Sequence, residues 1–409
     1  MKKTSWAAAI VASFLLLSLT ACTPSGGNPV KPENEDVDNA IKGTLTISET
    51  WPGKDEKGDP ITYFINSTYT IKEGGNLTIE EGAIVKFGPS GKITIEKTGV
   101  IIASGTIFTS YRNPIGRTIS INGGVDPAPG DWLNIYVNGG HSEFYDCEFS
   151  YGGKNTSTVY VYSSYATCKI DGCIFKYNDG TKSVSITVDA ALRYNENVPY
   201  GEDNTVTNTT FENNVWPLSM SPSYSVSGTN HFGKADKANE YNLIHFDDDN
   251  VTGTVVWEHL EIPYLYAGTT NTMKIGESNK SGNLTIKGGT KDDPTIVEFY
   301  TKGFNITKNQ GVLNLENNIH FTNCDKIPTT KYPGLHCDKS IKWKVIKGKT
   351  TYSYSESNPL LISNESMNII IDGYQATDKY SSEDYYENRQ CVIKDINTYE
   401  TIDLGSFQE

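Results

Sequence analysis

Arginine is scarce in this sequence of 409 residues, with only Arg112, Arg117, Arg193 and Arg389 present. Acidic side chains outnumber basic ones by 49 to 35, so the formal net charge is −14 at pH 7. Proteins that bind nucleic acids or other polyanions present basic surfaces. This charge balance excludes a nucleic-acid partner and disfavours anionic substrates such as uronic-acid polymers.

Motifs for catalysis and metal binding are absent as well. The sequence has no C-x-x-C pair, no G-x-S-x-G, no phosphate-binding loop and no zinc motif. Asp247–Asp249 lack the D-x-D-x-D-G spacing of a calcium loop, so we expect a solvated acidic turn there. His231, His245 and His259 recur every 14 residues without nearby cysteine, and we interpret them as unrelated surface or turn residues. No metal site and no cofactor is predicted.

The first 22 residues have the parts of a secretory signal. Lys2 and Lys3 precede an apolar run from Ala7 to Leu19, and small residues precede Cys22. The apolar run is too short to span a bilayer comfortably. We therefore expect residues 1–21 to be removed on export.

The tetrapeptide LTAC at positions 19–22 resembles the lipobox of bacterial lipoproteins. The resemblance implies that Cys22 becomes the lipidated first residue and anchors the protein to a bacterial membrane. Thr23, rather than aspartate, follows the cysteine, which implies sorting to the outer membrane. Ordinary secretion with a buried Cys22 is the alternative.

The chain contains one long segment twice. NLTIEEGAIVKF at 76–87 reappears as NLTIKGGTKDDPTIVEF at 283–299, with the apolar letters kept and the polar letters changed. Trp51 and Trp257 fit the same alignment. An internal repeat of this length indicates one structural unit used twice, the second copy shortened.

Short segments of the sequence alternate apolar and polar residues, which is typical of strands with one buried face. They are KITIE (92–96), WLNIYV (132–137) and SVSITV (183–188), with Trp132 expected opposite the inward residues. The inward residues are predicted to be Ile93, Ile95, Leu133, Ile135, Val137, Val184, Ile186 and Val188. No convincing amphipathic helix follows the signal.

Both a β-sandwich and a parallel β-helix can be built from such strands, and finer spacing distinguishes them. Phe149 in DCEFSY and Phe175 in GCIFKY lie 26 residues apart in like surroundings, and Phe211 follows in TTFENN. Like residues at like positions are what stacked coils require, because each coil covers only its neighbours. The spacing favours a β-helix.

The stretch from NLTIEEGAIVKF through GKITIEKTGVIIASGTIFTS to GDWLNIYV resembles the opening coils of right-handed parallel β-helix repeat-containing bacterial lipoproteins. The resemblance covers residues 45–180 and 251–323. It implies an all-β solenoid made of two related units. The predicted organisation is a signal peptide (1–21), a lipidated cysteine with a flexible acidic tether (22–42), a first β-helix unit (43–250) and a second, shortened unit with a C-terminal cap (251–409).

Six cysteines follow Cys22, and export permits disulfides. Cys147 and Cys173 are expected one coil apart, either as a disulfide or as two inward-facing thiols. Cys324 and Cys337 bracket a loop, and we predict a disulfide between them.

The sequence contains 25 tyrosines, whose rings can stack on sugars and suit protein contacts. Tyr380, Tyr385 and Tyr386 form the cluster that we predict as a ligand-binding site. The alternative is that these are ordinary strand residues with solvated hydroxyl groups.

These observations predict a non-catalytic, lipid-anchored protein of the bacterial cell envelope. Its extended β-helical face would bind glycans or surface proteins. The first alternative is a polysaccharide lyase or glycoside hydrolase of the pectin-lyase-like fold, since outward acids occur on any coil. The second alternative is a structural scaffold of the envelope.

Replacing Cys22 by serine tests the anchor. The wild-type protein expressed in a bacterium should incorporate labelled palmitate and enter the detergent phase of a Triton X-114 separation. Cys22→Ser should lose the label and move to the aqueous phase, because the acylated sulfur is gone. Equal partitioning of the two proteins would contradict the lipid anchor.

Overall fold

The computed structural model describes residues 39–119, 126–268, 273–277, 279–290 and 292–299. Isolated strands are described beyond them, at 304–306, 311–315, 319–323, 360–362, 369–371, 393–395 and 401–402. Within these residues the protein is almost entirely β, and the single helical element is the short 3-10 turn η1 (Ala235–Lys237). The prediction of an all-β protein is confirmed, and its strands form long parallel sheets.

The largest sheet contains 18 strands. They are β1 (Ile41–Leu45), β3 (Thr62–Ile71), β5 (Ile84–Phe87), β6 (Lys92–Glu96), β8 (Ile107–Ser110), β9 (Asn134–Asn138), β11 (Glu148–Ser150), β12 (Val159–Val161), β14 (Ile174–Lys176), β15 (Leu192–Tyr194), β17 (Thr210–Glu212), β18 (Leu218–Met220), β19 (His231–Phe232), β20 (Ile244–Phe246), β22 (Tyr264–Tyr266), β25 (Thr295–Phe299), β28 (Ile319–Asn323) and β30 (Ile369–Ile371).

Four smaller sheets complete the described strands. The six-stranded sheet contains β2 (Ser48–Trp51), β4 (Asn76–Ile79), β7 (Val100–Ser104), β10 (His141–Tyr145), β13 (Thr167–Asp171) and β16 (Asn204–Thr207). A three-stranded sheet contains β21 (Gly253–Trp257), β24 (Gly282–Ile286) and β27 (Gly311–Leu315), and a pair contains β23 (Met273–Ile275) and β26 (Phe304–Ile306). The last sheet contains β29 (Leu360–Ile362), β31 (Ile393–Asp395) and β32 (Thr401–Ile402).

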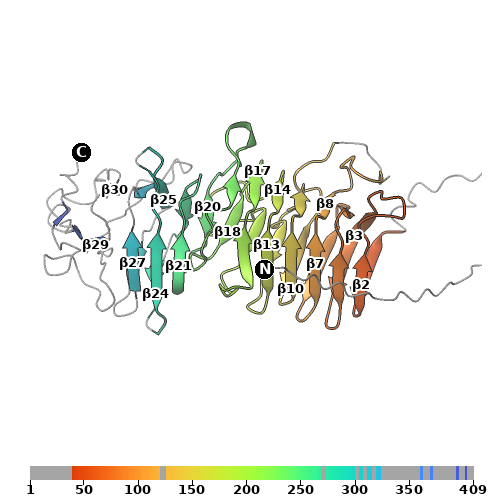
Figure 1. Cartoon of the computed structure of the whole chain (residues 1–409), viewed down its shortest axis with the longest axis horizontal. Helices are drawn as coiled ribbons and strands as arrows, with labels where there is room; N and C mark the ends of the chain where they lie inside the picture. Colours follow the sequence, from red (N-terminus) through yellow and green to blue (C-terminus); the bar gives the residue numbers. More distant parts are fainter. Residues whose placement is uncertain are drawn as a thin grey trace, which may run out of the picture. The chain divides into compact units, whose positions relative to one another are not determined.

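The ten-residue strand β3 divides the largest sheet into two ladders, because its first half pairs with β5 and its second half with β6. The first ladder continues from β5 through β8, β11, β14 and β17 to β19. The second ladder continues from β6 through β9, β12, β15, β18 and β20 to β22. The six-stranded sheet is a third ladder, and Figure 1 shows its strands β2, β7, β10 and β13 side by side in one direction.

From β4 to β18 the chain visits the three ladders in turn. Strands β4, β5 and β6 lie in the third, first and second ladder, and β7, β8 and β9 repeat that order. Each strand therefore pairs in parallel with the strand three elements later in the sequence. Parallel neighbours cannot be joined by a tight hairpin, so the chain must pass through other elements before it returns.

The apolar positions of the repeated segment face the core, as predicted. Leu77, Ile79, Val85 and Phe87 are each at most 1% exposed. The corresponding Leu284, Ile286 and Val297 of the second copy are fully buried, as is Trp257. The apolar residues that both copies of the repeat keep are therefore those that pack in the hydrophobic core.

The phenylalanine ladder predicted from the 26-residue spacing is present. Phe149 pairs with Phe175, and Phe175 pairs with Phe211, in the parallel register of the first ladder. The ring centroids are 4.7 Å and 5.0 Å apart, and the planes of the stacked rings are nearly parallel. These separations match the roughly 4.8 Å between hydrogen-bonded strands, so the rings stack at the strand spacing.

Cys147 and Cys173 precede this ladder in the same register and are buried free thiols. Their sulfurs approach backbone carbonyl oxygens, at 3.5 Å for Cys147 with Ala103 and 3.4 Å for Cys173 with Phe144. The alternative of two inward-facing thiols is thus confirmed over a disulfide. Cys168 is also free, and burial raises the pKa of its thiol to about 12.

Three buried asparagines form a second ladder of side chains at a turn. Asn178 Nδ2 donates to Asn214 Oδ1 at 2.9 Å, and Asn214 Nδ2 donates to Asn239 Oδ1 at 2.9 Å. Each Nδ2 also donates to a main-chain carbonyl of the preceding strand, as Asn214 does to Phe175 at 3.0 Å. The amides satisfy backbone groups that the bend would otherwise leave unpaired.

Two strand predictions are wrong. Residues 183–188 form no strand, and Ile186 is 36% exposed while Val188 packs on Trp216. Trp132 is fully buried rather than facing outward, because its ring stacks on Phe87 at 4.2 Å and its Nε1 donates to the Ser150 carbonyl at 2.9 Å. Apolar alternation alone does not reveal such packing partners.

Asn214→Ala should destabilise the protein by roughly 3 kcal/mol. The substitution removes the buried hydrogen bonds of the Asn214 side chain with Asn178, with Asn239 and with the Phe175 carbonyl. Urea denaturation followed by circular dichroism measures the change. The exposed Asn197→Ala is the control and should change the free energy of unfolding by less than about 1 kcal/mol. Equal stability of the two variants would rule out this role for the ladder.

Candidate functional site

The predicted site residues lie outside the part of the chain that the structure describes. They are Cys22, Cys324, Cys337, Tyr380, Tyr385 and Tyr386. Their roles in lipidation, disulfide formation and ligand binding stay predictions. Within the described part, the structure contains no helix that could cross a membrane and no group of three or more side chains suited to a metal ion.

A row of outward residues crosses the second ladder in register. On each strand the residues before and after the row member face the core, as Val159 and Val161 do on either side of Tyr160. The row contains Thr94, Tyr136, Tyr160, Arg193, Ser219, His245 and Leu265. The parallel register thus brings together side chains that are far apart in the sequence.

Tyr136, Tyr160 and Tyr162 form a cluster that we term the tyrosine platform. Their ring centroids lie 5.6–5.7 Å apart in all three pairs, and Tyr162 is 43% exposed. Lys92 Nζ lies 4.4 Å from the centroid of the Tyr136 ring, and the Arg193 guanidinium lies 5.3 Å from that of Tyr160. Both cations are within the range of a cation–π interaction.

Tyr136 and Tyr160 of the tyrosine platform are neutral at pH 7 and provide aromatic faces. Burial, with the neighbouring Tyr162 and Tyr160, raises the pKa of the Tyr136 hydroxyl to about 12. Burial likewise raises the pKa of Tyr160, which also receives a hydrogen bond from Asn195 Nδ2 at 3.4 Å. The platform can therefore stack on a flat apolar face and bond to polar groups at its edge.

Arg193 and Asp247 form a buried ion pair next to the platform. Arg193 is 8% exposed and Asp247 2% exposed, with Nη2 and Oδ2 3.2 Å apart. Burial raises the pKa of Asp247 to about 7, although Arg193 opposes the shift. The predicted solvated turn is therefore wrong for Asp247, whose buried carboxylate pairs with Arg193 of β15, two strands away from β20 in the second ladder.

His245 is fully buried, so its assignment as a surface or turn residue is wrong. Its Nε2 lies 2.9 Å from the Ser185 carbonyl oxygen and its Nδ1 lies 3.1 Å from Ser219 Oγ. A carbonyl oxygen only accepts hydrogen bonds, so Nε2 carries the hydrogen and Nδ1 accepts from the serine. Burial lowers the pKa of His245 to about 4, and the ring is neutral at pH 7.

Ser219, His245 and Asp247 are the residue types of a hydrolytic triad, but their arrangement differs from one. In a triad the serine and the acid bond to opposite nitrogens of the histidine. Here the Asp247 carboxylate lies 3.5 Å from Nδ1, the nitrogen that Ser219 also faces. All three side chains are at most 3% exposed, so a substrate cannot reach them. The cluster stabilises the fold.

Residues 181–190 cover this cluster and explain the missing strand at 183–188. Val188 and Ala190 pack in a small core with Trp216, Leu243 and Leu265 on the outer side of the second ladder. Trp216 Nε1 donates to the Thr181 carbonyl at 2.9 Å. Val188 and Ala190 of this segment are buried against the outer face of the ladder, whereas Ile186 is exposed.

No family model, curated protein or solved structure matches the chain. The tyrosine platform and the sequence are therefore the features from which a function can be inferred.

His245→Gln should change how stability depends on pH. The folded-state pKa of His245, about 4, is below the ordinary value of 6.5, so the native state binds fewer protons than the unfolded chain between these values. The wild type therefore loses up to about 3 kcal/mol as the pH falls from about 6.5 to 4.

Glutamine can still donate to the Ser185 carbonyl but does not titrate. The stability advantage of the wild type over His245→Gln should therefore shrink on acidification. Urea denaturation of both proteins at several pH values measures it. A pH-independent difference would contradict a buried neutral histidine.

Proposed function

We propose that this protein is a right-handed parallel β-helix of the bacterial cell envelope, anchored by a lipid, that binds glycan chains without cleaving them. The cyclic visits to three parallel ladders support a β-helix, since each turn through the ladders completes one coil. The right hand is the one expected for crossovers between parallel strands. The signal and the lipobox-like LTAC support the export and the anchor.

The tyrosine platform carries the proposal of glycan binding. The rings of Tyr136, Tyr160 and Tyr162 contact one another across neighbouring strands. Tyr162 is the most exposed of the three residues. A sugar ring has a flat apolar face that stacks on tyrosine, while its hydroxyl groups bond to polar neighbours. Lys92 supplies such a neighbour beside Tyr136, and Asn195 Nδ2 donates to the Tyr160 hydroxyl.

The ionisable groups beside the platform favour binding over catalysis. A glycosidase needs two carboxyl groups exposed on either side of the bond to be broken. Asp247, the acid paired with the platform's Arg193, is buried and bonded within the protein. Its environment is that of a structural ion pair rather than that of a catalytic acid.

A structural scaffold is the second candidate function, and the asparagine ladder favours it. Asn178, Asn214 and Asn239 stabilise successive turns without presenting a group to solvent. Such a ladder would suit a rigid scaffold as well as it suits a glycan-binding protein. The exposed ring of Tyr162, however, adds no group to that ladder and is better explained by a ligand.

Tyr160→Ala combined with Tyr162→Ala should weaken glycan binding by about tenfold or more, because the stacking surface is removed. A glycan array and pull-down with insoluble bacterial and plant polysaccharides measure binding by the full chain. Tyr177→Ala is the matched control, since Tyr177 is 39% exposed but lies on the first ladder, stacked on Tyr151. Unchanged binding in the double variant, or no binding by the wild type, would refute the proposal.

A further inference from the structure

The sheets are interrupted at one place, and a depression forms there. The six-stranded sheet ends at β16, and the three-stranded sheet begins at β21. Between them runs the segment Ser225–Thr229, attached by a single parallel bridge between Val226 and Trp257. Ser225, Ser227 and Gly228 carry small or no side chains, so the surface sinks between the two sheets.

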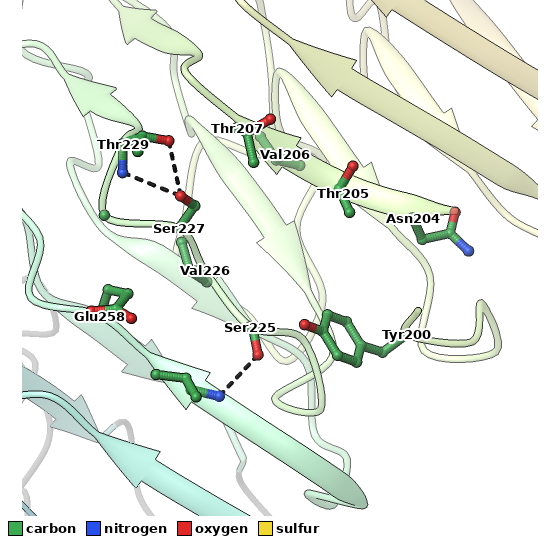
Figure 2. A pocket seen from close by; sticks show the side chains of 12 residues that line it. Tyr200, Asn204, Thr205, Val206, Thr207, Ser225, Val226, Ser227, Thr229 and Glu258 are labelled. Carbon is green, nitrogen blue, oxygen red and sulfur yellow. Dashed lines mark hydrogen bonds between the residues drawn. The ribbon is translucent and has the colours of Figure 1, made fainter. Parts of the chain in front are cut away.

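The depression is a cavity of about 440 Å³. Figure 2 shows it bounded by Thr205 and Thr207 of β16, by the small residues of the segment, and by Tyr200 and Glu258 at opposite sides of the view. Its volume is within the roughly 300–1,000 Å³ of small-molecule sites. The cavity uses none of the side chains of the tyrosine platform.

Several polar groups in this cavity still have hydrogen-bonding capacity. Ser225 Oγ accepts the Val256 N–H at 2.9 Å, which leaves its hydroxyl hydrogen free to donate (Figure 2). The hydroxyl groups of Tyr200 and Thr205 and the carboxylate of Glu258 have no partner among the described residues. By contrast, Ser227 and Thr229 bond to each other at 2.9 Å.

Tyr200 is held in place although it is 42% exposed. Its ring contacts Tyr224 edge-on, with centroids 5.5 Å apart, and the buried Tyr224 donates to the Val198 carbonyl at 3.0 Å. A ring that is already ordered loses little entropy on binding. Tyr200 therefore has the properties of a stacking residue.

A second cavity, of about 510 Å³, shares Tyr200 as part of its lining. Its other lining residues include the acids Glu196, Asp249 and Glu277, of which Glu277 is paired with Lys280. Ser221 Oγ donates to Asp249 at 2.7 Å. Both cavities are thus rich in oxygen acceptors and acidic in balance.

We propose that the two cavities form a binding site for a neutral oligosaccharide, with one sugar ring against Tyr200 in the cavity of Figure 2 and the chain continuing into the second cavity. Vicinal sugar hydroxyls donate to the Glu258 carboxylate, and such charge-assisted bonds are the strong ones. Thr205 and Ser225 bond to further hydroxyl groups. The carboxylates disfavour anionic sugars, and a simple amine would leave the hydroxyl-bearing residues unused.

Calorimetric titration of the full chain with neutral tetrasaccharides tests this site. The probes are cellotetraose, maltotetraose, xylotetraose, mannotetraose and chitotetraose, with tetragalacturonate and choline as charged comparisons. At least one neutral probe should bind with a Kd below about 1 mM, and the charged probes should bind more weakly.

Two variants and their controls locate the binding. Tyr200→Ala should weaken it about tenfold and Glu258→Gln about fivefold, while Tyr200→Phe, which keeps the ring, should retain most of it. Tyr177→Ala and the exposed Glu202→Gln are the matched controls and should bind as the wild type does.

The outcome separates this site from the tyrosine platform. Loss of tetrasaccharide binding in Tyr200→Ala, but not in the Tyr160→Ala and Tyr162→Ala protein, assigns the ligand to the cavities. If binding is lost only in the Tyr160→Ala and Tyr162→Ala protein, this inference is overturned and the ligand is assigned to the tyrosine platform. No binding of any neutral probe at about 10 mM, or preferential binding of tetragalacturonate or choline, also overturns it.

Discussion

The constraint on which the structure depends is the parallel register between successive strands of each ladder. Because that register is kept, the same position on each strand faces inward, and its side chain must pack against the equivalent one on the next strand. The rings of Phe149, Phe175 and Phe211 stack at 4.7–5.0 Å for this reason. The backbone hydrogen bonds and the packing of core side chains thus require the same distance between strands. A substitution that fits the backbone register but not the side-chain stack therefore destabilises the fold.

The features that repeat with this spacing could be predicted from the sequence. Leu77, Ile79, Val85 and Phe87 were recognised because a second copy preserved them, and all are buried. The alignment of Cys147 with Cys173 followed from the same spacing as the phenylalanines, while the choice between a disulfide and two inward thiols did not. In each case the sequence recorded both members of a contact at a regular interval, so the contact could be inferred without coordinates.

The outward row was not predictable in this way, because its members are irregularly spaced. Tyr136 follows Thr94 by 42 residues and Tyr160 follows Tyr136 by only 24, since the turns between strands differ in length. The burial of His245 and Asp247 is not predictable from periodicity because their partners come from other segments. Ser185 lies in the irregular segment before β15, and Arg193 lies on β15 itself. Sequence periodicity predicts which residues of a strand face inward or outward. Which residues of different strands contact each other depends on the lengths of the turns between the strands.

Departures from the regular parallel ladders are therefore where this protein can bind a ligand specifically. Inward positions are restricted by their neighbours on both sides, and the asparagine ladder shows that even polar ones stack in register. Turns and outward positions are restricted on one side only. Where the third ladder stops at β16 and the next sheet starts at β21, the loss of a paired strand leaves a hollow that small residues line. Parallel ladders that continued without a break would present uniform grooves, whereas the interruption supplies a concave surface with its own arrangement of hydroxyl, carboxylate and aromatic groups.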